Sequence, residues 1–374
     1  RIMAYTTIDD PTKFFSTNLW VGDDTSPRTL TGFGHQPDFV WARYRDSGSL
    51  NHVLTDSVRG GDKMVFSNSN AAEDTKSHGE ITSFNSDGIT VADGTNSTYP
   101  RLYFNDDDPF GGGIAGNYVG WSWKGGGTAV SNGDGDITST VSANTTAGFS
   151  VVKYTGNGNS SATFGHGLGV KPKIGLLKPT STTGNWNWWQ DTTGNNSADV
   201  RMHLHLTDAN NSNYPITFNT TTITLPSLAD ASWNGSGTEF IFYCFAEKQG
   251  YSKFGSYTGN GNADGAFVYT GFRPGWVIIK KSSGTNEWGI WDNKRSTFNV
   301  TDDIVYANLT NASNYTSEDS SLLENTAEAS VISGVDSILD DSDVSNKIDE
   351  SSASEIDIDA LVGTAKGNHT DQYV

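Results

Sequence analysis

Cysteine is nearly absent from this sequence of 374 residues, which contains only Cys244. A single cysteine cannot form an internal disulfide, so no covalent cross-link within the chain is expected. Cys244 lies inside the apolar aromatic run at residues 240–245, which is typical of a strand buried on both faces. We therefore predict a buried, unreactive thiol at this position.

Long hydrophobic runs are also missing. No stretch approaches the roughly 20 apolar residues of a membrane-spanning helix, so membrane insertion is not expected. The first ten residues, RIMAYTTIDD, lack the apolar centre of a secretory signal peptide. Hydrophobic residues make up only 34% of the chain, which predicts thin, sheet-based cores in which aromatic side chains provide much of the buried area.

Positive charge is scarce, because 24 lysines and arginines stand against 43 aspartates and glutamates, giving a formal net charge of −19. Nucleic-acid binding requires clustered positive charge, so nucleic acid is not an expected partner. The negative charge favours solubility and keeps copies from aggregating. No GxSxG elbow and no Ser-His-Asp grouping is recognisable, so we expect no enzymatic activity and no cofactor.

Glycine and aromatic residues are abundant, with 42 Gly, 11 Trp, 14 Tyr and 18 Phe. Short aromatic and β-branched runs punctuated by glycine and asparagine are typical of β-structure with many turns. The sequence therefore predicts an all-β fold made of tandem antiparallel β-sandwich units. An acidic C-terminal segment follows them, and its pattern fits helix, edge strands or partly disordered chain.

A repeat organises the chain. The hexapeptide YTGNGN occurs at residues 154–159 and at 257–262, an offset of 103 residues that is the size of a domain. Three landmarks recur: an aromatic residue two positions before a glycine, a proline 15 or 16 residues after that glycine, and an aspartate 18 or 19 residues after the proline. The landmarks are Trp20, Tyr154 and Tyr257; Pro37, Pro172 and Pro274; and Asp56, Asp191 and Asp292.

The landmarks predict the same local structure three times. Proline cannot donate to a sheet ladder, so each landmark proline is expected at a strand entrance. The strand that follows should turn through a polar loop and return toward the aspartate, forming a hairpin. A further hairpin is predicted in the first unit from residues 81–84 and 89–91, with a counterpart in the second unit from residues 216–218 and 223–225.

The predicted organisation has six parts. They are an N-terminal arm at residues 1–18, a first unit at 19–124, a flexible Gly/Ser/Thr linker at 125–148, a second unit at 149–250, a partial third unit at 251–315 and an acidic, serine-rich segment at 316–374. The first two units close with aromatic strands, of which the third unit has no copy. Either the acidic segment or a neighbouring subunit therefore supplies a substitute, and the second alternative predicts self-assembly.

Several longer motifs carry a family resemblance. They are MAYTTID from Met3, QPDFVW from Gln36, DSVRGGDK from Asp56, TSFNSDG from Thr82, GHGLGVKPK from Gly165, YCFAEKQGYSKFGSYTGNG from Tyr243 and FVYTGFRP from Phe267. Together they resemble a family of repeated β-domains in structural and tail-fibre-like proteins of tailed phages, particularly marine ones. The resemblance covers roughly residues 3–300 and implies a virion component with lectin-like jelly-roll domains, and it offers no catalytic residues to carry over.

The resemblance leads us to expect a phage virion structural protein, either a fibre or a surface appendage. Its expected partners are copies of itself, for instance in a trimer, and other virion proteins. It would be assembled in the host cytoplasm and be extracellular on the released particle. A host surface glycan is a candidate ligand, with affinity gained by multivalency. A capsid decoration or scaffold protein without a receptor role, and a polysaccharide depolymerase, are the alternatives.

Four tryptophans are the candidate glycan contacts, namely Trp186, Trp188, Trp288 and Trp291. Aromatic rings suit stacking with sugars, but they suit a hydrophobic core equally well. Strand alternation places Trp186 and Trp188 on one face and Trp189 on the other, so one side is expected to pack inside. Core packing is therefore the alternative to glycan contact.

Three further patterns are candidates for metal or carboxylate chemistry, each with a simpler alternative. His203 and His205 would face one side of a strand, but no third metal ligand is identifiable. The segment NGDGD at residues 132–136 resembles part of a calcium loop without its terminal glutamate. We therefore predict no metal site.

A glycosidase requires two carboxylates that face each other across a cleft. The candidates in this sequence are Asp106, Asp107, Asp108, Asp56, Asp191 and Asp292. The last three recur at predicted strand ends, where an aspartate more often forms a turn by bonding to its own backbone. The turn role is the expected one.

Overall fold

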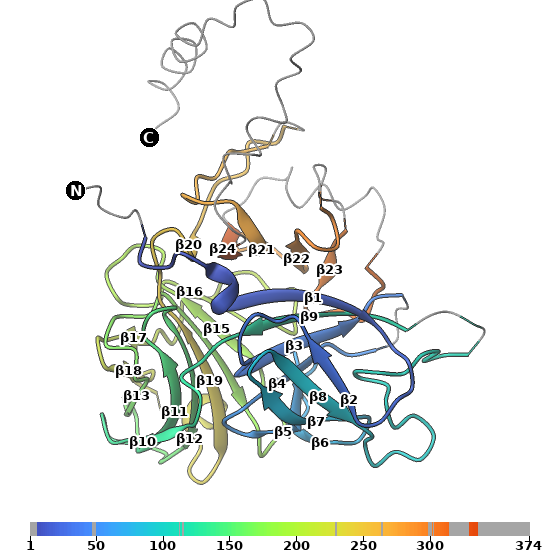
Figure 1. Ribbon diagram of the computed structural model, residues 1–374. Coiled ribbons are helices and arrows are strands. Elements are labelled where there is room, and N and C mark those ends of the chain that lie inside the picture. The colour runs from blue at the N-terminus through green and yellow to red at the C-terminus, as the bar shows by residue number, and fades with distance from the viewer. Residues whose placement is uncertain are drawn as a thin grey trace, which may run out of the picture. The chain divides into compact units, whose positions relative to one another are not determined.

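The chain is nearly all β-structure in the computed structural model (Figure 1). The structure describes residues 6–46, 50–111, 113, 116–228, 230–262, 265–297, 301, 303–313 and, for the backbone, 329–335. Within these ranges the helices are two single turns, η1 (Pro11–Lys13) and α1 (Ala231–Asn234). Asp10 and Asp230 cap them by accepting a hydrogen bond from the backbone N–H two residues later. The predicted all-β fold is confirmed.

Three main antiparallel sheets contain five equivalent strands each, in the same order. The first sheet runs β1 (Phe15–Val21), β9 (Asn117–Trp123), β3 (Phe39–Tyr44), β4 (Val53–Asp56) and β5 (Gly60–Phe66), with β6 (Asp74–Thr75) at its edge. The second runs β12 (Phe149–Thr155), β19 (Glu239–Phe245), β14 (Ile174–Pro179), β15 (Asn187–Gln190) and β16 (Val200–Met202). The third runs β20 (Lys253–Gly255), β24 (Ala329–Val335), β21 (Pro274–Lys281), β22 (Trp288–Asp292) and β23 (Val305–Tyr306).

The pairing registers show that the aromatic landmarks are structurally equivalent. Trp20 of β1 lies opposite Tyr118 of β9, and their stacked rings are 5.6 Å apart. Tyr154 of β12 lies opposite Phe240 of β19, with the rings 5.0 Å apart. Tyr257 comes just after the end of β20. The number of residues between it and a given register position of β20 equals the number between Tyr154 and the matching position of β12. One sheet has therefore been built three times from three stretches of the sequence.

The landmark prolines lie where the repeat predicts them. Pro37 and Pro172 come two residues before β3 and β14, and Pro274 is the first residue of β21. Hairpins then form between β3 and β4, between β14 and β15, and between β21 and β22. The predicted strand entrances and hairpins are confirmed in all three units.

The third sheet is closed by a strand from the acidic segment. Residues Ala329–Val335 form β24, which pairs with β20 on one side and β21 on the other, as β9 and β19 do in their sheets. Of the two alternatives that the sequence left open, the chain itself supplies the substitute. The remainder of residues 316–374 lies outside the described residues.

Two small sheets cover the outer faces of the first and second main sheets. The first consists of β2 (Arg28–Thr31), β8 (Gly88–Ala92) and β7 (Glu80–Asn85). The second consists of β13 (Thr163–Gly165), β18 (Thr222–Thr224) and β17 (Thr217–Phe218). Each contains the hairpin predicted from the sequence and encloses its own hydrophobic cluster against the main sheet. The first two units are therefore sandwiches.

The predicted linker at residues 125–148 is instead structured. It contains β10 (Val130–Asn132) and β11 (Ser139–Asn144), which extend the second sheet beyond β12. The glycine-rich composition hid the alternation of buried and exposed side chains in this segment. Val141, for example, is 3% exposed and packs in the cluster between the second main sheet and its small sheet. The second unit therefore begins inside the segment predicted to be a linker, and the two units are joined without a flexible spacer.

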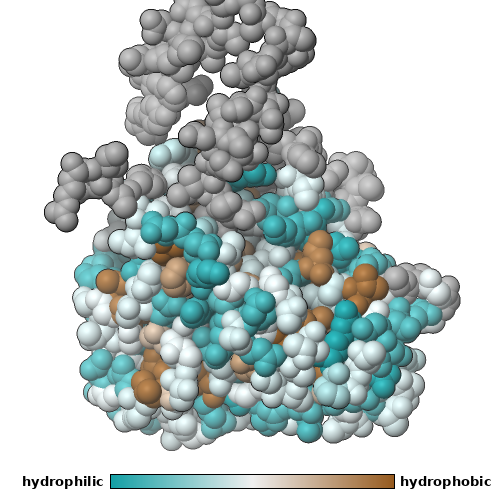
Figure 2. All heavy atoms as spheres, viewed as in Figure 1, coloured by the Kyte–Doolittle hydropathy of each residue, from teal (hydrophilic) through white to brown (hydrophobic). Residues whose placement is uncertain are grey.

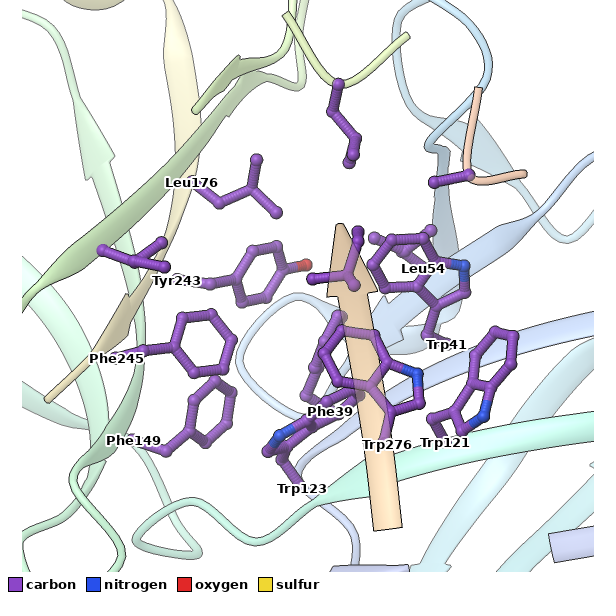
Figure 3. Packing of buried hydrophobic residues seen from close by; sticks show 14 of the residues in the cluster. Phe39, Trp41, Leu54, Trp121, Trp123, Phe149, Leu176, Tyr243, Phe245 and Trp276 are labelled. Carbon is purple, nitrogen blue, oxygen red and sulfur yellow. The ribbon is translucent and has the colours of Figure 1, made fainter. Parts of the chain in front are cut away.

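The inner faces of the three main sheets share one hydrophobic core. Phe39 and Trp123 of the first sheet, Phe149 and Tyr243 of the second and Trp276 of the third converge there (Figure 3). Trp276 lies 5.3 Å from Trp123 between ring centroids, and Phe39 lies 4.4 Å from Tyr243. Because the three sheets bury their inner faces against one another in this cluster, we expect the three units to unfold together. On the surface in Figure 2, hydrophobic residues form separate patches among hydrophilic ones.

Buried hydrogen bonds join neighbouring units around this core, and they use equivalent positions of the repeat. In the first sheet Asp56 accepts a hydrogen bond from the Tyr243 hydroxyl of the second, at 2.9 Å. In the third sheet Asp292 accepts one from the Trp121 indole of the first, at 3.0 Å. Tyr243 and Trp121 hold matching positions in β19 and β9, opposite the third residue of β14 and β3. The repeat therefore extends to the contacts between units.

Buried cations occupy a second equivalent position. Arg43, Lys178 and Lys280 lie at matching places in β3, β14 and β21 and are at most 1% exposed. Lys178 donates to the carbonyl oxygen of Asn70 in the first unit, at 3.3 Å. Burial lowers the pKa of Lys178 to about 7 and that of Lys280 to about 8.

Candidate functional site at the open face of the third sheet

The outer face of the third main sheet has no second layer among the residues that the structure describes. The corresponding faces of the first and second sheets lie under their small sheets. On the third sheet this face carries a smaller cluster of mostly buried apolar residues, which we name the open face because no small sheet lies over it among the described residues. Its members are Tyr257, Val277, Ile279, Trp291, Ile304, Tyr306 and Leu309.

One position of the repeat shows what the missing layer changes. Leu30, Phe164 and Phe267 each lie eight residues after the landmark glycine of their unit. Leu30 and Phe164 are 7% and 0% exposed, whereas Phe267 is 83% exposed. Tyr269, two residues later, is 66% exposed, so the connection between β20 and β21 displays two aromatic side chains. Contiguous exposed apolar side chains often mark an interaction surface.

A cavity of about 300 Å³ lies on the open face, between β21, β22 and the turn that follows β22. Val277, Ile279 and Trp291 give it an apolar floor. In the second sheet Gly175 holds the place of Val277, and Ile216 approaches it so closely that an added Cβ would lie 3.3 Å from its Cδ1 atom. The space that is empty in the third unit is therefore filled from within the chain in the second.

Trp291 is the distinctive side chain of the cavity. It is the register equivalent of Trp189, since the two lie opposite Val277 and Gly175. Trp189 is completely buried and donates its indole N–H to the carbonyl oxygen of Tyr214 at 3.0 Å. Trp291 is 8% exposed, and its indole N–H donates to no acceptor among the described residues. A ligand in the cavity could therefore accept this hydrogen bond.

The charge at the cavity is positive. Arg273 lies on its rim, is exposed, and forms no ion pair with any residue that the structure describes. Asp292 is the only carboxylate of the described lining, and its Oδ2 atom is bound by the Arg295 Nε atom at 2.6 Å. The Asp292 charge is thus neutralised inside the protein, and the Arg273 charge is left for an external partner.

The four predicted glycan-contact tryptophans have different environments. Trp186 and Trp288 are 0% exposed and Trp188 is 1% exposed, all within the shared core. Trp188 and Trp288 pack on each other with ring centroids 4.9 Å apart. For these three the structure favours the core-packing alternative, because neighbouring side chains cover their rings. Trp291 alone among the four lines a cavity, and Trp189 faces away from Trp186 and Trp188 as predicted.

The landmark aspartates form turns, as the simpler alternative predicted. Asp56 and Asp292 accept hydrogen bonds through Oδ1 from the backbone N–H groups two and three residues later. Asp191 accepts one from the backbone N–H of Gly194 at 2.6 Å, although it lies one residue beyond the register position of the other two. Partial burial opposes its ionisation, but hydrogen bonds from Lys173 and Gly194 hold the pKa of Asp191 below its usual value.

Two of the three candidates at residues 106–108, Asp106 and Asp107, belong to an acidic group at the surface of the first unit. Carboxylate oxygens of Asp24, Asp106 and Asp107 lie within 4.8 Å of one another. Partial burial, together with the charges of Asp24 and Asp107, raises the pKa of Asp106. This spacing is compatible with a cation, but exposed acidic groups are common without one, and Asp24 also forms an ion pair with Arg101 at 3.3 Å.

His203 and the calcium-like segment both have structural roles. His203 binds Asp208 through Nδ1 at 2.6 Å and contacts Arg201 through Nε2, so both ring nitrogens are engaged. No group of metal-ligand spacing contains His203 or His205 among the described residues. In the segment 132–136, the Asp136 carboxylate accepts the backbone N–H of Thr163 at 3.0 Å and fixes β13.

Comparison with protein families gives one match. The family described as "Domain of unknown function (DUF7483)" matches residues 10–334, which include all three main sheets. The chain belongs to this family. No curated protein and no solved structure matches the DUF7483 chain. None of its described helices is long and apolar enough to span a membrane.

Sequence reasoning on this DUF7483 chain found Trp291 but missed Arg273, Val277 and Ile279. Their significance comes from the missing second layer, which no single residue type indicates. A signal was nevertheless present, since the third unit has no counterpart of the hairpin predicted at residues 216–218 and 223–225. The alignment of Phe267 with Phe164 could then have identified an uncovered aromatic position.

Proposed function

We propose that this chain is a structural protein of a phage particle, a fibre or surface appendage that assembles with copies of itself and with other virion proteins. The observation that supports it most is the third main sheet, which has no covering small sheet among the described residues and whose connection between β20 and β21 exposes Phe267 and Tyr269. A closely packed body that exposes aromatic side chains suits a component that holds its shape and presents a surface. The motifs that resemble tail-fibre-like proteins support the same function.

The protein that we propose is not an enzyme, and the environments of two candidate aspartates support this. Asp56 and Asp292 are each held by an arginine at 2.6 Å and are 0% exposed at the side chain. A carboxylate buried in an ion pair cannot reach a glycosidic bond. Incubation of the chain with host surface polysaccharide should therefore release no reducing ends. Their release would favour the depolymerase alternative.

Immunogold electron microscopy of purified particles tests the location, using an antibody raised against the recombinant chain. We expect gold label on fibres or appendages, at a few copies per particle. Label over the whole capsid surface would favour the decoration or scaffold alternative. Particles without label, when the same antibody detects the chain in infected-cell lysate, would contradict the proposal.

Self-assembly is tested separately by light scattering of the full-length chain over a range of concentrations. The proposal predicts a mass that is an integral multiple of the 40.2 kDa chain. A monomer at every concentration, both alone and mixed with other virion proteins, would contradict the assembly part of the proposal.

A further inference from the structure

We infer that the cavity on the open face binds an acidic saccharide, with Trp291 as the surface for a sugar ring and Arg273 as the partner of its carboxylate. The inference rests on the proposed function and extends it by naming the site and the class of glycan. The cavity, the apolar floor, the polar rim and the local charge each support it.

The floor of the cavity suits the apolar face of a sugar ring. Val277, Ile279 and Trp291 are contributed by two adjacent strands, β21 and β22, so their positions are fixed by the sheet. The volume of about 300 Å³ is at the small end of ligand sites, which fits one or two sugar units. The C–H face of such a ring packs against an indole, and the N–H of Trp291 is available to a hydroxyl oxygen.

The rim supplies hydroxyl groups. Thr297 is exposed, and Ser296 accepts the backbone N–H of Asp303 through Oγ at 3.1 Å, which leaves the Ser296 O–H free to donate. In the second unit the equivalent space is filled by an aliphatic side chain, Ile216. The mixed lining of the third unit fits a ligand with one apolar face and several polar edges better than it fits another apolar protein layer.

The charge favours an acidic sugar over a neutral one. Arg273 is an unpaired guanidinium among the described residues, and its fork of donors matches a carboxylate. A neutral sugar offers no charge to this guanidinium, so an acidic sugar gains a contact that a neutral one lacks.

Isothermal titration of the full-length chain with oligogalacturonate, and with dextran of similar length, tests the inference. We expect binding of oligogalacturonate that weakens with salt, and at least about tenfold weaker binding of dextran. The substitution Arg273→Gln should weaken oligogalacturonate binding by about tenfold, because one charge-assisted contact is lost. Lys171→Gln is the matched control, since Lys171 is also exposed and also precedes a landmark proline. Equal effects of the two substitutions would overturn the inference.

A second variant fills the cavity without removing a core residue. Thr297→Trp adds an indole at an exposed rim position, so the fold should be preserved and oligogalacturonate binding lost. Unchanged binding by this variant would place the saccharide elsewhere. If Thr297→Trp or Phe267→Ser instead lowers the mass measured by light scattering, the face is covered by a second copy and the saccharide inference fails.

The failures of the inference and of the proposed function are distinguishable. A chain located on phage fibres that binds neither oligosaccharide refutes the saccharide site alone. A chain that binds oligogalacturonate through Arg273 but is missing from particles refutes the virion role alone.

Discussion

At the scale of single residues, the repeated buried ion pair is the feature with the clearest energetic meaning. Asp56–Arg59 and Asp292–Arg295 have the same spacing, the same Nε–Oδ2 distance of 2.6 Å and side chains at most 2% exposed. Removing one partner of such a pair leaves an uncompensated buried charge. The loss of stability is then larger than the free energy that the intact pair contributes. Each pair also fixes the turn and reaches the neighbouring unit through Tyr243 or Trp121.

We predict that Arg295→Met lowers the free energy of unfolding by about 3–5 kcal/mol, because Asp292 loses its partner in the core. Urea denaturation followed by tryptophan fluorescence measures the change. Lys153→Met is the control, since Lys153 pairs with Glu239 at the surface, and it should cost less than about 1 kcal/mol. A loss for Arg295→Met as small as that of the control would show that the buried pair is dispensable.

We also predict that His35 makes the fold sensitive to acid. His35 is 2% exposed, its ring contacts the Thr12 carbonyl and the Ser122 hydroxyl, and burial lowers its pKa to about 4. Because an unfolded histidine has a pKa near 6.5, the unfolded chain binds the proton more readily between pH 6.5 and 4. Stability should therefore fall as the pH is lowered through this window, by up to about 3 kcal/mol from His35.

The variant His35→Gln removes this titration while keeping an amide that can make both contacts. Urea midpoints measured at pH 7, 5.5 and 4 should decrease less in the variant than in the parent protein. Parallel decreases in both proteins would assign the acid sensitivity to other groups, such as His205, whose pKa burial also lowers to about 4.

At the scale of elements, the small sheets explain why the repeat position held by Phe164 and Phe267 is buried in the second unit and exposed in the third. Phe164 lies in β13 beneath the hairpin β17–β18, whereas Phe267 lies in a connection without a covering hairpin among the described residues. The same side chain therefore contributes burial energy in one unit and none in the other.

We predict that Phe164→Ser costs about 3–5 kcal/mol of unfolding free energy, since it removes a fully buried aromatic ring. Phe267→Ser should change stability by less than about 0.5 kcal/mol. Thermal denaturation of the two single variants gives the comparison. A large loss for Phe267→Ser would show that the third unit has a covering layer after all.

The strand β24 gives a prediction about truncation. A chain ending at residue 336 keeps β24 and should unfold at the temperature of the full-length chain. A chain ending at residue 328 lacks β24 and exposes the facing edges of β20 and β21, so it should aggregate or lose the third sheet. Size-exclusion chromatography and circular dichroism measure both outcomes. Equal behaviour of the two truncations would remove β24 from the fold.

Much of this element structure was predictable from the sequence, and the exceptions have physical causes. The prolines, hairpins and aromatic closing strands were predictable because turn chemistry and side-chain alternation are local signals. The strands β10 and β11 were missed because glycine and serine obscured the alternation around Val141. The strand β24 lacks the aromatic residues of β9 and β19, so its pairing with β20 and β21 depends on the rest of the sheet. The open face was missed because it depends on the lack of a covering hairpin among the described residues, for which the sequence signal was a missing counterpart of residues 216–225.

At the scale of the whole molecule, three copies of one sheet form a single body around a common core. The core draws on residues from the first strand of the first sheet to the last strand of the third, including Phe15 and Val305. A chain with 34% hydrophobic residues has too few of them to build a thick core in each unit. Sharing one core lets each main sheet bury its inner face.

The most direct test of this account is differential scanning calorimetry of the full-length chain. If the three main sheets share one core, residues 6–335 should unfold in a single transition with a calorimetric enthalpy equal to the van't Hoff enthalpy. Two or three separable transitions, one for each sheet, would contradict the shared core and with it the claim that the three units form one cooperative body.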